Sequence, residues 1–446
     1  MLTYQDFQAC ADRAAFVNRL VDAHRESEAY QTALTADEYD RQRNSTIYNY
    51  VRRLFTLTGA PVRDFTASNM RVASNFFHRL NTQRCAYSLG NGVEFTKEGT
   101  KARLGARFDT DLQRLGYMAL IHGVAFGLWN EDGLKVFPLT EFAPLWDEET
   151  GALRAGVRFW RLGRDKPARA VLYEEDGWTP YRADRPDGLL RQAGERTAYR
   201  LTVRHTAADG DRVVAGENYA ALPIIPLWGS RLKQSTLVGM RQAIDSYDLI
   251  QSGFANDLSD CAMVYWIIEN CGGMTPDDLA RFRDQLKLLH IANADTDGGG
   301  RVTPYTQEIP FEARRAYLGH MRAAIYESFG GLDVHAVAAG ATNDHIDAAY
   351  QPMDEEADDF EYQLIGFVQA LLGLLGIEDT PLFKRNRVSN QREQVQMLLS
   401  EAPYLDRRAI LTKLPNVTVD EVKRLLAAGH GADCGAGHGK EGMPLA

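Results

Sequence analysis

The sequence predicts a mixed α+β protein built from several modules. Its 446 residues are too many for one ordinary domain, and about two to four modules are expected at this length. Hydrophobic residues make up 45% of the chain and charged residues 25%, the balance of a globular protein with a buried core. Helical patterns flank a region of strand-like runs between Gly, Asp and Pro turns at residues 138–219.

The first 122 residues are predicted to be mainly helical. Apolar residues recur at helical spacing over residues 15–24, 45–57, 68–87 and 108–121. A short strand is expected at residues 93–95, after the turn that ends the third of these helices.

An antiparallel β region follows these helices. The turn Asn-Glu-Asp-Gly at residues 130–133 predicts a hairpin whose second strand covers residues 134–138. Further strands are expected at residues 157–161, 169–173 and 198–205. Residues 222–228 contain two prolines, each of which disfavours helix before it, so this segment is predicted to be a stiff extended linker.

Residues 234–260 are predicted to form one helix about 40 Å long, at about 1.5 Å per residue. Its apolar stripe consists of Leu237, Met240, Ile244, Tyr247, Ile250, Phe254 and Leu258. The opposite stripe consists of Arg241, Asp245, Asp248, Ser252, Asn256 and Ser259. A surface helix on the core of its own domain would show such stripes. The length of this helix and its place between a linker and a small insert argue for a further role.

A small β-α-β insert is predicted beyond this helix. Its strands are expected at residues 263–268, 290–292 and 302–305, and its helix at residues 279–289. A second amphipathic helix at residues 311–329 leads back. The pattern therefore places a small module at the far end of two helices.

A third long helix is predicted over residues 344–375, after a stretch rich in small residues. It can kink at Pro352 and Gly366. Its first half is acidic and contains no Lys or Arg, and its second half is apolar. A short polar strand at residues 383–388 and small helices up to residue 428 follow, and the Gly-rich residues 429–446 are expected to be disordered.

Charge and cysteine content narrow the class of protein. The net charge of −10 disfavours a protein that grips DNA by neutralising phosphates. Five scattered cysteines suit a reducing compartment. No apolar run approaches the roughly 20 residues needed to cross a bilayer, and no secretory signal is visible, so we expect a protein that works where it is made.

The sequence gives little support for a catalytic function. The chain lacks a P-loop, HExxH, GxSxG and a Rossmann fingerprint. Residues 293–304 imitate a calcium loop, but Pro304 stands where a bidentate Glu is required. The acidic run at residues 354–361 could pair carboxylates for general acid catalysis, and a solvated helix face is the simpler interpretation. We expect no cofactor and no metal.

Four segments, in order, resemble one known family. They are residues 69–93, the helix end and hairpin at 119–126, the run from 224–227 to 244–257, and the helical ending at 401–426. Together they are similar to the portal, or head–tail connector, proteins of tailed double-stranded-DNA bacteriophages, of the long-tailed (siphophage) type. One departure is Asn91-Gly92, which stands where that family usually has Pro.

The resemblance implies the portal fold and a division of the chain. The expected parts are a wing (1–232, helical then antiparallel β), stem helices (233–261 and 310–330), a clip (262–309), a tunnel loop (331–343), a long kinked helix (344–378), a crown (379–428) and a disordered tail (429–446).

The resemblance also implies the partners. About twelve copies would form a ring at the capsid vertex, assembled in the host bacterial cytoplasm and kept in the virion. Double-stranded DNA would pass through its channel during packaging and ejection. The ring would meet the terminase large subunit, a head–tail adaptor protein and the major capsid or scaffold protein. No membrane is involved.

Three sets of residues are carried over from this resemblance. The channel lining would include His335, Ala338, Ala339, Thr342, Asn343, Asp344, His345 and Asp347. The polar face of the stem, facing the lumen or the outside, would include Arg241, Asp245, Asp248, Ser252 and Asn256. The clip would contact partners through Asp277, Asp278, Arg281 and Arg283.

Two other hypotheses remain open from the sequence. One is an α+β enzyme that uses the carboxylates of residues 354–361 on a small substrate. The other is a different structural head or adaptor protein that shares only the fold of the β region. That second alternative predicts no long helix pair flanking a β-α-β insert.

Overall fold

The computed structural model describes residues 2–55, 59–63, 68–131, 133–206, 210–260, 265–269, 301–305, 310–333 and 343–387, with isolated positions between 275 and 281 and between 398 and 426. Helices and antiparallel sheets are both extensive, which confirms the predicted α+β class. Within these residues, no helix is both long enough and apolar enough to span a bilayer.

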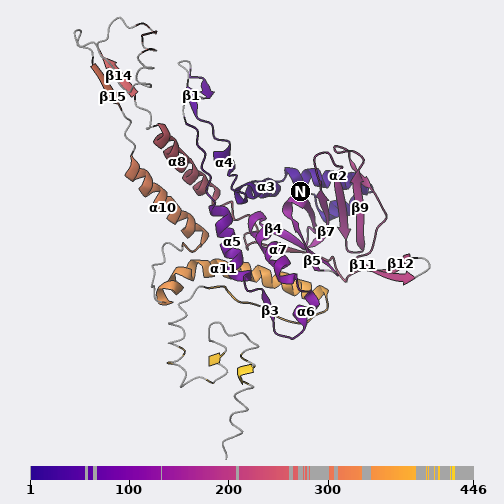
Figure 1. The fold of residues 1–446 in the computed structure, drawn as a ribbon. Coiled ribbons are helices and arrows are strands. Elements are labelled where there is room, and N and C mark those ends of the chain that lie inside the picture. Colours follow the sequence, from indigo (N-terminus) through magenta and orange to yellow (C-terminus); the bar gives the residue numbers. More distant parts are fainter. Residues whose placement is uncertain are drawn as a thin grey trace, which may run out of the picture.

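A five-stranded antiparallel sheet forms one part of the body (Figure 1). In spatial order its strands are β10 (Leu190–Gln192), β9 (Gly177–Ala183), β8 (Arg169–Glu174), β7 (Leu153–Trp160) and β6 (Phe142–Trp146). Helices α1 (Tyr4–Ala9) and α2 (Arg13–Glu26) pack on it, and Phe7, Phe16 and Val17 are buried in the shared core. The predicted antiparallel β region is confirmed.

A three-stranded sheet forms the centre of the molecule. It contains β13 (Ile224–Trp228), β4 (Val124–Asn130) and β5 (Gly133–Pro138), in that order. Helix α7 (Phe108–His122) packs on β4 and β5, and α11 (Asn343–Leu374) packs on β13. The apolar second half of α11 is buried here through Leu364, Phe367, Val368 and Leu371.

Strand β13 corrects the prediction of a linker at residues 222–228. Ile224 pairs with Leu128 and Trp228 with Val124, so the segment is an edge strand. Ile224 and Leu227 are buried, and the burial of these apolar side chains favours a strand in the sheet over a linker in solvent. Pro226 is tolerated because an edge strand needs ladder hydrogen bonds on one side only.

Two long helices project from this body side by side (Figure 1). They are α8 (Arg241–Asp260) and α10 (Phe311–Phe329), and the second has the predicted bounds. At their far end β14 (Tyr265–Glu269) pairs antiparallel with β15 (Arg301–Tyr305). The predicted insert helix at 279–289 and strand at 290–292 lie outside the described residues.

The remaining elements connect these layers. They are α3 (Glu28–Asp40), α4 (Ser45–Tyr48), β1 (Arg53–Phe55), β2 (Pro61–Arg63), α5 (Phe76–Leu89), β3 (Val93–Phe95), α6 (Thr100–Leu104), η1 (Leu139–Glu141), β11 (Arg200–Thr206), β12 (Gly210–Glu217) and β16 (Pro381–Phe383). Strand β16 pairs with β3, so the polar strand predicted at residues 383–388 instead covers residues 381–383.

Three predicted helices are shorter in the structure. The one expected at residues 45–57 ends at Tyr48, because residues 53–55 pair with residues 61–63. The one expected from residue 68 begins at Phe76, and the one expected from residue 234 begins at Arg241. Before α8, the hydroxyls of Ser235 and Thr236 donate to carbonyl oxygens at the end of α7, and this fixes a turn instead of a helix.

Packing of α11 on the central sheet predicts that substitutions at two positions of this helix differ greatly in their effect on the free energy of unfolding. Leu364 is fully buried, whereas Tyr362 is 73% exposed. Leu364→Ala should lower the free energy of unfolding by about 2–5 kcal/mol, because it leaves a cavity. Tyr362→Ala should change it by less than about 0.5 kcal/mol. Denaturant unfolding of both variants measures this, and equal losses would contradict the assignment of the buried face.

Candidate functional site: the paired helices and the acidic long helix

The polar stripe of α8 holds an extended segment of the same chain. Asp248, Ser252 and Asn256, here called the side-chain ladder, follow one another at intervals of four residues. They accept hydrogen bonds from the backbone N–H groups of Ser74 (2.9 Å), Val72 (2.9 Å) and Met70 (2.5 Å), respectively.

The ladder also satisfies the carbonyl groups of this segment. The Ser252 hydroxyl donates to the carbonyl oxygen of Val72 at 3.4 Å, and the Asn256 amide donates to that of Met70 at 3.3 Å. The carbonyl of Ser74 accepts at 3.1 Å from Asn44, whose amide also donates to Asp248. Every second residue of the segment thus has both backbone groups paired without a neighbouring strand.

Matching repeat lengths explain why a helix can bind an extended chain in this way. Four helical residues advance by about 6.0 Å. Two extended residues advance by about 6.6 Å. Short polar side chains at every fourth helical position therefore meet the backbone at every second position of the segment. Beyond Asn256, the hydroxyl of Ser68 donates to the hydroxyl of Ser259 at 2.9 Å, a side-chain contact outside the four-residue spacing.

The ladder corrects the prediction that this polar face lines the lumen or the outside. Asp248 and Ser252 are fully buried and Asn256 is 3% exposed, because residues 68–75 of the same chain cover them. The same contacts explain why residues 68–75 are extended instead of helical. Burial raises the pKa of Asp248, while the hydrogen bonds from Asn44 and Ser74 oppose that shift.

Asp245 and Arg241 lie nearer the body. Asp245 accepts hydrogen bonds from the hydroxyls of Tyr39 and Thr46, and so ties α8 to α3 and α4. Arg241 lies 3.8 Å from the Asp245 carboxylate and is largely exposed. Of the five predicted stem residues, Arg241 is the one on an exposed position of the protomer, and Asp245 is partly buried.

The apolar side of α8 joins it to α10 and the body. Leu237, Met240 and Ile244 are buried with Ile325 and Phe329. Farther out, Phe254 packs on Phe311 with ring centroids 5.4 Å apart, and Asp257 pairs with Arg314 at 2.5 Å. Leu249 and Leu258 remain 41% and 51% exposed. The helix pair is therefore tied by both apolar and ionic contacts, with apolar side chains left on its surface.

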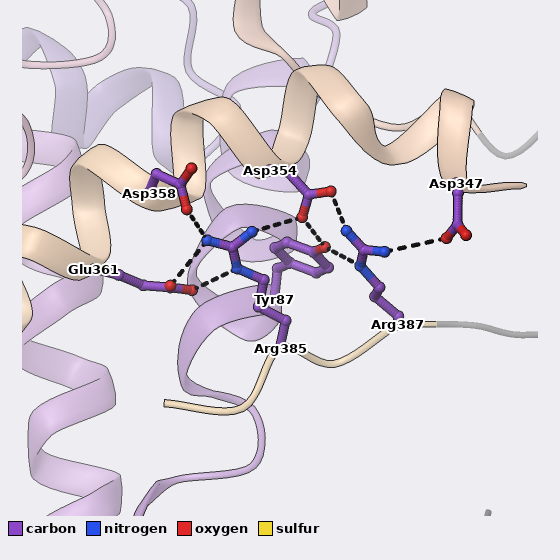
Figure 2. A network of polar contacts seen from close by, with 7 residues as sticks. All are labelled: Tyr87, Asp347, Asp354, Asp358, Glu361, Arg385 and Arg387. Carbon is purple, nitrogen blue, oxygen red and sulfur yellow. Dashed lines mark hydrogen bonds and ion pairs between the residues drawn. The ribbon is translucent and has the colours of Figure 1, made fainter. Parts of the chain in front are cut away.

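The acidic half of α11 is held by two arginines that follow β16 (Figure 2). Arg385 binds Glu361 through two hydrogen bonds of 3.0 Å, Asp354 at 2.8 Å, and Asp358. Arg387 binds Asp347 at 3.1 Å, and also Asp354. We call Arg385, Arg387 and their four carboxylate partners the arginine clamp.

Tyr87 links the arginine clamp to α5. Its hydroxyl donates to Asp354 at 2.6 Å and accepts from Arg387 at 2.7 Å (Figure 2). Its ring stacks on Tyr350, with centroids 5.6 Å apart. Burial raises the pKa of Tyr87 to about 12, with the hydrogen bond to Asp354 acting in the same direction. The clamp thus fixes α11, α5 and the segment after β16 to one another.

Ion pairing sets the charge state of the clamp. Partial burial raises the pKa of Asp354, but hydrogen bonds from Arg387, Tyr87 and Arg385 outweigh it and hold the pKa below its usual range. The hydrogen bond to Glu361 is the main cause that raises the pKa of Arg385. A carboxyl group held ionised by arginines is poorly suited to donate a proton at neutral pH. This geometry disfavours the enzyme hypothesis at residues 354–361.

Several predicted channel residues lie outside the described part of the chain. They are His335, Ala338, Ala339 and Thr342. Asn343 and Asp344 begin α11, and His345 is exposed one residue later. Asp347, predicted to line the channel, pairs with Arg387, and its side chain is 65% exposed.

The predicted clip residues are described in part. Asp277 and Arg281 are exposed, Asp278 is half-buried, and Arg283 lies outside the described residues. Asp278 accepts hydrogen bonds from the hydroxyl of Thr275 at 2.7 Å and from its backbone N–H at 3.1 Å. These bonds lower the pKa of Asp278. Among the described residues, no group of three potential metal ligands comes together.

The sequence of this chain matches one family of known proteins. A family model described as phage portal protein, SPP1 Gp6-like, matches residues 21–433. The chain belongs to this portal protein family. The resemblance inferred from the four segments is therefore confirmed.

Two named relatives agree with the family. The portal protein of Bacillus phage SPP1 is 25% identical over 385 residues, covering 78% of this chain and 73% of that protein. The portal protein of Clostridium phage phiCD119 is 27% identical over 228 residues, covering 48% of this chain and 50% of that protein. The chain thus spans half the length of the Clostridium phage protein.

Two features of the site, the arginine clamp and the side-chain ladder, were not predicted from the sequence. The arginine clamp had one usable signal, since a helix half with eight acids and no Lys or Arg needs countercharge from elsewhere. Arg385 and Arg387 alternate as on one side of an extended segment. The ladder also had a signal, because Asp, Ser and Asn are short side chains that bind backbone groups.

The ladder predicts a specific pattern of amide protection. Ser252→Ala should raise hydrogen exchange at the amide of Val72 by about fivefold, because that N–H loses a partner worth about 1 kcal/mol. The exposed Gln242→Ala on the same helix serves as the matched control. Exchange at residues 68–75, followed by NMR or mass spectrometry, checks this. Unchanged protection would show that Ser252 does not hold the segment.

The arginine clamp predicts acid sensitivity of stability. Because the folded pKa of Asp354 is lowered, its stabilising effect is present above its unfolded pKa of about 3.9 and is lost as the pH falls through the folded value. The double variant Arg385→Gln, Arg387→Gln should lose less stability between neutral and acidic pH than the wild type. Arg114→Gln, which removes an arginine without an ion pair in the described residues, is the control. Equal acid sensitivity of clamp variant and wild type would contradict the ion pairing.

Proposed function

We propose that this chain is the subunit of a portal ring at a capsid vertex, through which double-stranded DNA is packaged and later ejected. The family match over residues 21–433 carries this proposal. The pair α8 and α10, which leaves the body and ends in the strands β14 and β15, is consistent with stem and clip (Figure 1). About twelve copies in a closed ring would meet through unlike surfaces.

Passage of DNA needs a wall that does not hold phosphates. The net charge of −10 per chain supports this, because each phosphate–Lys or phosphate–Arg contact would add affinity and slow the DNA. The arginine clamp neutralises part of the acidic surface of α11, so this helix contributes less repulsion than its sequence suggests. We assign contact with DNA to residues 331–343, including His335, Ala338, Ala339 and Thr342, and to the start of α11.

The proposed partners follow from what the chain would need. Its sequence has no P-loop, so a terminase large subunit would supply the energy for packaging. We place terminase and head–tail adaptor contacts at the clip, with Asp277, Asp278, Arg281 and Arg283 as candidates. Capsid or scaffold protein would contact the wing. The ring would assemble in the host cytoplasm and remain in the virion.

Mass measurement of the purified full chain tests the proposal. Mass photometry should find particles of about twelve times the 49.9 kDa subunit, since closed rings have a fixed copy number. A species that stays at 49.9 kDa at all concentrations would contradict it. A broad ladder of open oligomers without a preferred size would also contradict a closed ring.

A further inference from the structure

A cleft of about 440 Å³ lies beside β5 and has no role in the proposed function. All six residues of β5, Gly133–Pro138, line it, together with residues of α7, η1 and β7. Successive strand residues point to opposite faces of a sheet. A cleft that touches all six therefore follows the edge of the strand.

This edge of β5 is open. β5 is the outer strand of the central sheet and pairs with β4 alone. Within the described residues, its backbone makes no hydrogen bond beyond that pairing. An unpaired edge presents N–H and C=O groups to another extended chain, and proteins recognise peptides in this way by adding a strand.

The charge of the cleft is opposite to that of the whole chain. Four cations and two carboxylates line it, a net charge of +2, whereas the chain carries −10. Arg107, Arg114 and Lys135 are exposed, and among the described residues they form no ion pair. Arg107 also directly precedes the N-terminus of α7, where the helix dipole favours anions.

Arg158 completes the cleft from β7. It pairs with Glu141 at 3.2 Å, and its guanidinium lies 4.5 Å from the ring centre of Phe137. Its Nε–H is buried and has no hydrogen-bond partner among the described residues. A buried donor without a partner is costly to the fold.

We propose that an extended, carboxylate-rich segment of a neighbouring copy of this chain binds here and adds a strand to the edge of β5. Its backbone would pair with β5, and its carboxylates would lie against Lys135, Arg107 and Arg114. The proposal rests on the proposed function, because a ring brings unlike surfaces of adjacent copies together.

Charge complementarity favours a protein segment over DNA. The carboxylates of Asp111 and Glu141 would face phosphates in a DNA complex. Within the part of the chain that the structure describes, three cations and one acid of the cleft lack an ion pair, which is little of the charge that a DNA-binding surface uses. The unpaired N–H and C=O groups of the strand edge can form a ladder with a peptide backbone, which a nucleic acid does not have.

Zero-length cross-linking of the assembled full chain tests this inference. A water-soluble carbodiimide joins a Lys amine to a carboxyl group with loss of water. Particles co-assembled from heavy-isotope-labelled and unlabelled subunits are treated, digested and analysed by mass spectrometry. Lys135 should link to an Asp or Glu of a differently labelled copy. Lys135→Arg should abolish that link and keep the assembly intact.

A charge reversal supplies the matched comparison. Lys135→Glu should raise the concentration needed for assembly by about tenfold, because like charges then face each other. Lys166→Glu, at another exposed lysine, should leave that concentration unchanged.

Three outcomes would overturn the inference. Assembled particles whose Lys135 links to no other copy would remove the docking site and leave the ring standing. Loss of DNA binding by Lys135→Glu with normal assembly would make the cleft a nucleic-acid surface. A protein that stays at 49.9 kDa would contradict both the ring and the docking site, and the mass alone shows it.

Discussion

The arrangement of the projecting helices depends on the side-chain ladder of α8. Asp248, Ser252 and Asn256 bind the backbone N–H groups of alternate residues in segment 68–75, and Asn44, Ser252 and Asn256 bind the carbonyl groups of the same residues. Helix and segment are therefore held along their length. Buried backbone groups need partners, and here helix side chains replace a neighbouring strand. Because Asn44 and Asp245 add contacts with the start of α4 and with α3, the helix leaves the body in a fixed direction.

A second constraint acts on the acidic helix. In the arginine clamp, four carboxylates form ion pairs with the two arginines, and these pairs help to hold α11 to α5 and to the segment after β16. The carboxylates belong to Asp347, Asp354, Asp358 and Glu361. Carboxylates that appear available for repelling DNA in the sequence therefore serve structure first. In the proposed channel, electrostatic repulsion of DNA would come mainly from other acids.

Sequence patterns located most elements but not their partners. Apolar periodicity found α2, α7, α10 and α11 because each buries one stripe against a sheet or helix. It extended α5 back to residue 68, because the apolar spacing of residues 70–72 does not reveal that their backbone binds α8. The polar stripe of α8 was found correctly and placed wrongly in the open, since spacing alone does not tell a solvated face from one that binds backbone. Arg385 and Arg387 are far from α11 in sequence, so only the fold brings them together.

Electron microscopy of the purified particle tests the central claim most directly, because rotational symmetry and a hole are visible without any assumption about individual residues. The account predicts annular particles with one rotational symmetry, an open central channel and narrow projections on one side formed by paired helices. Compact particles without a hole would contradict it.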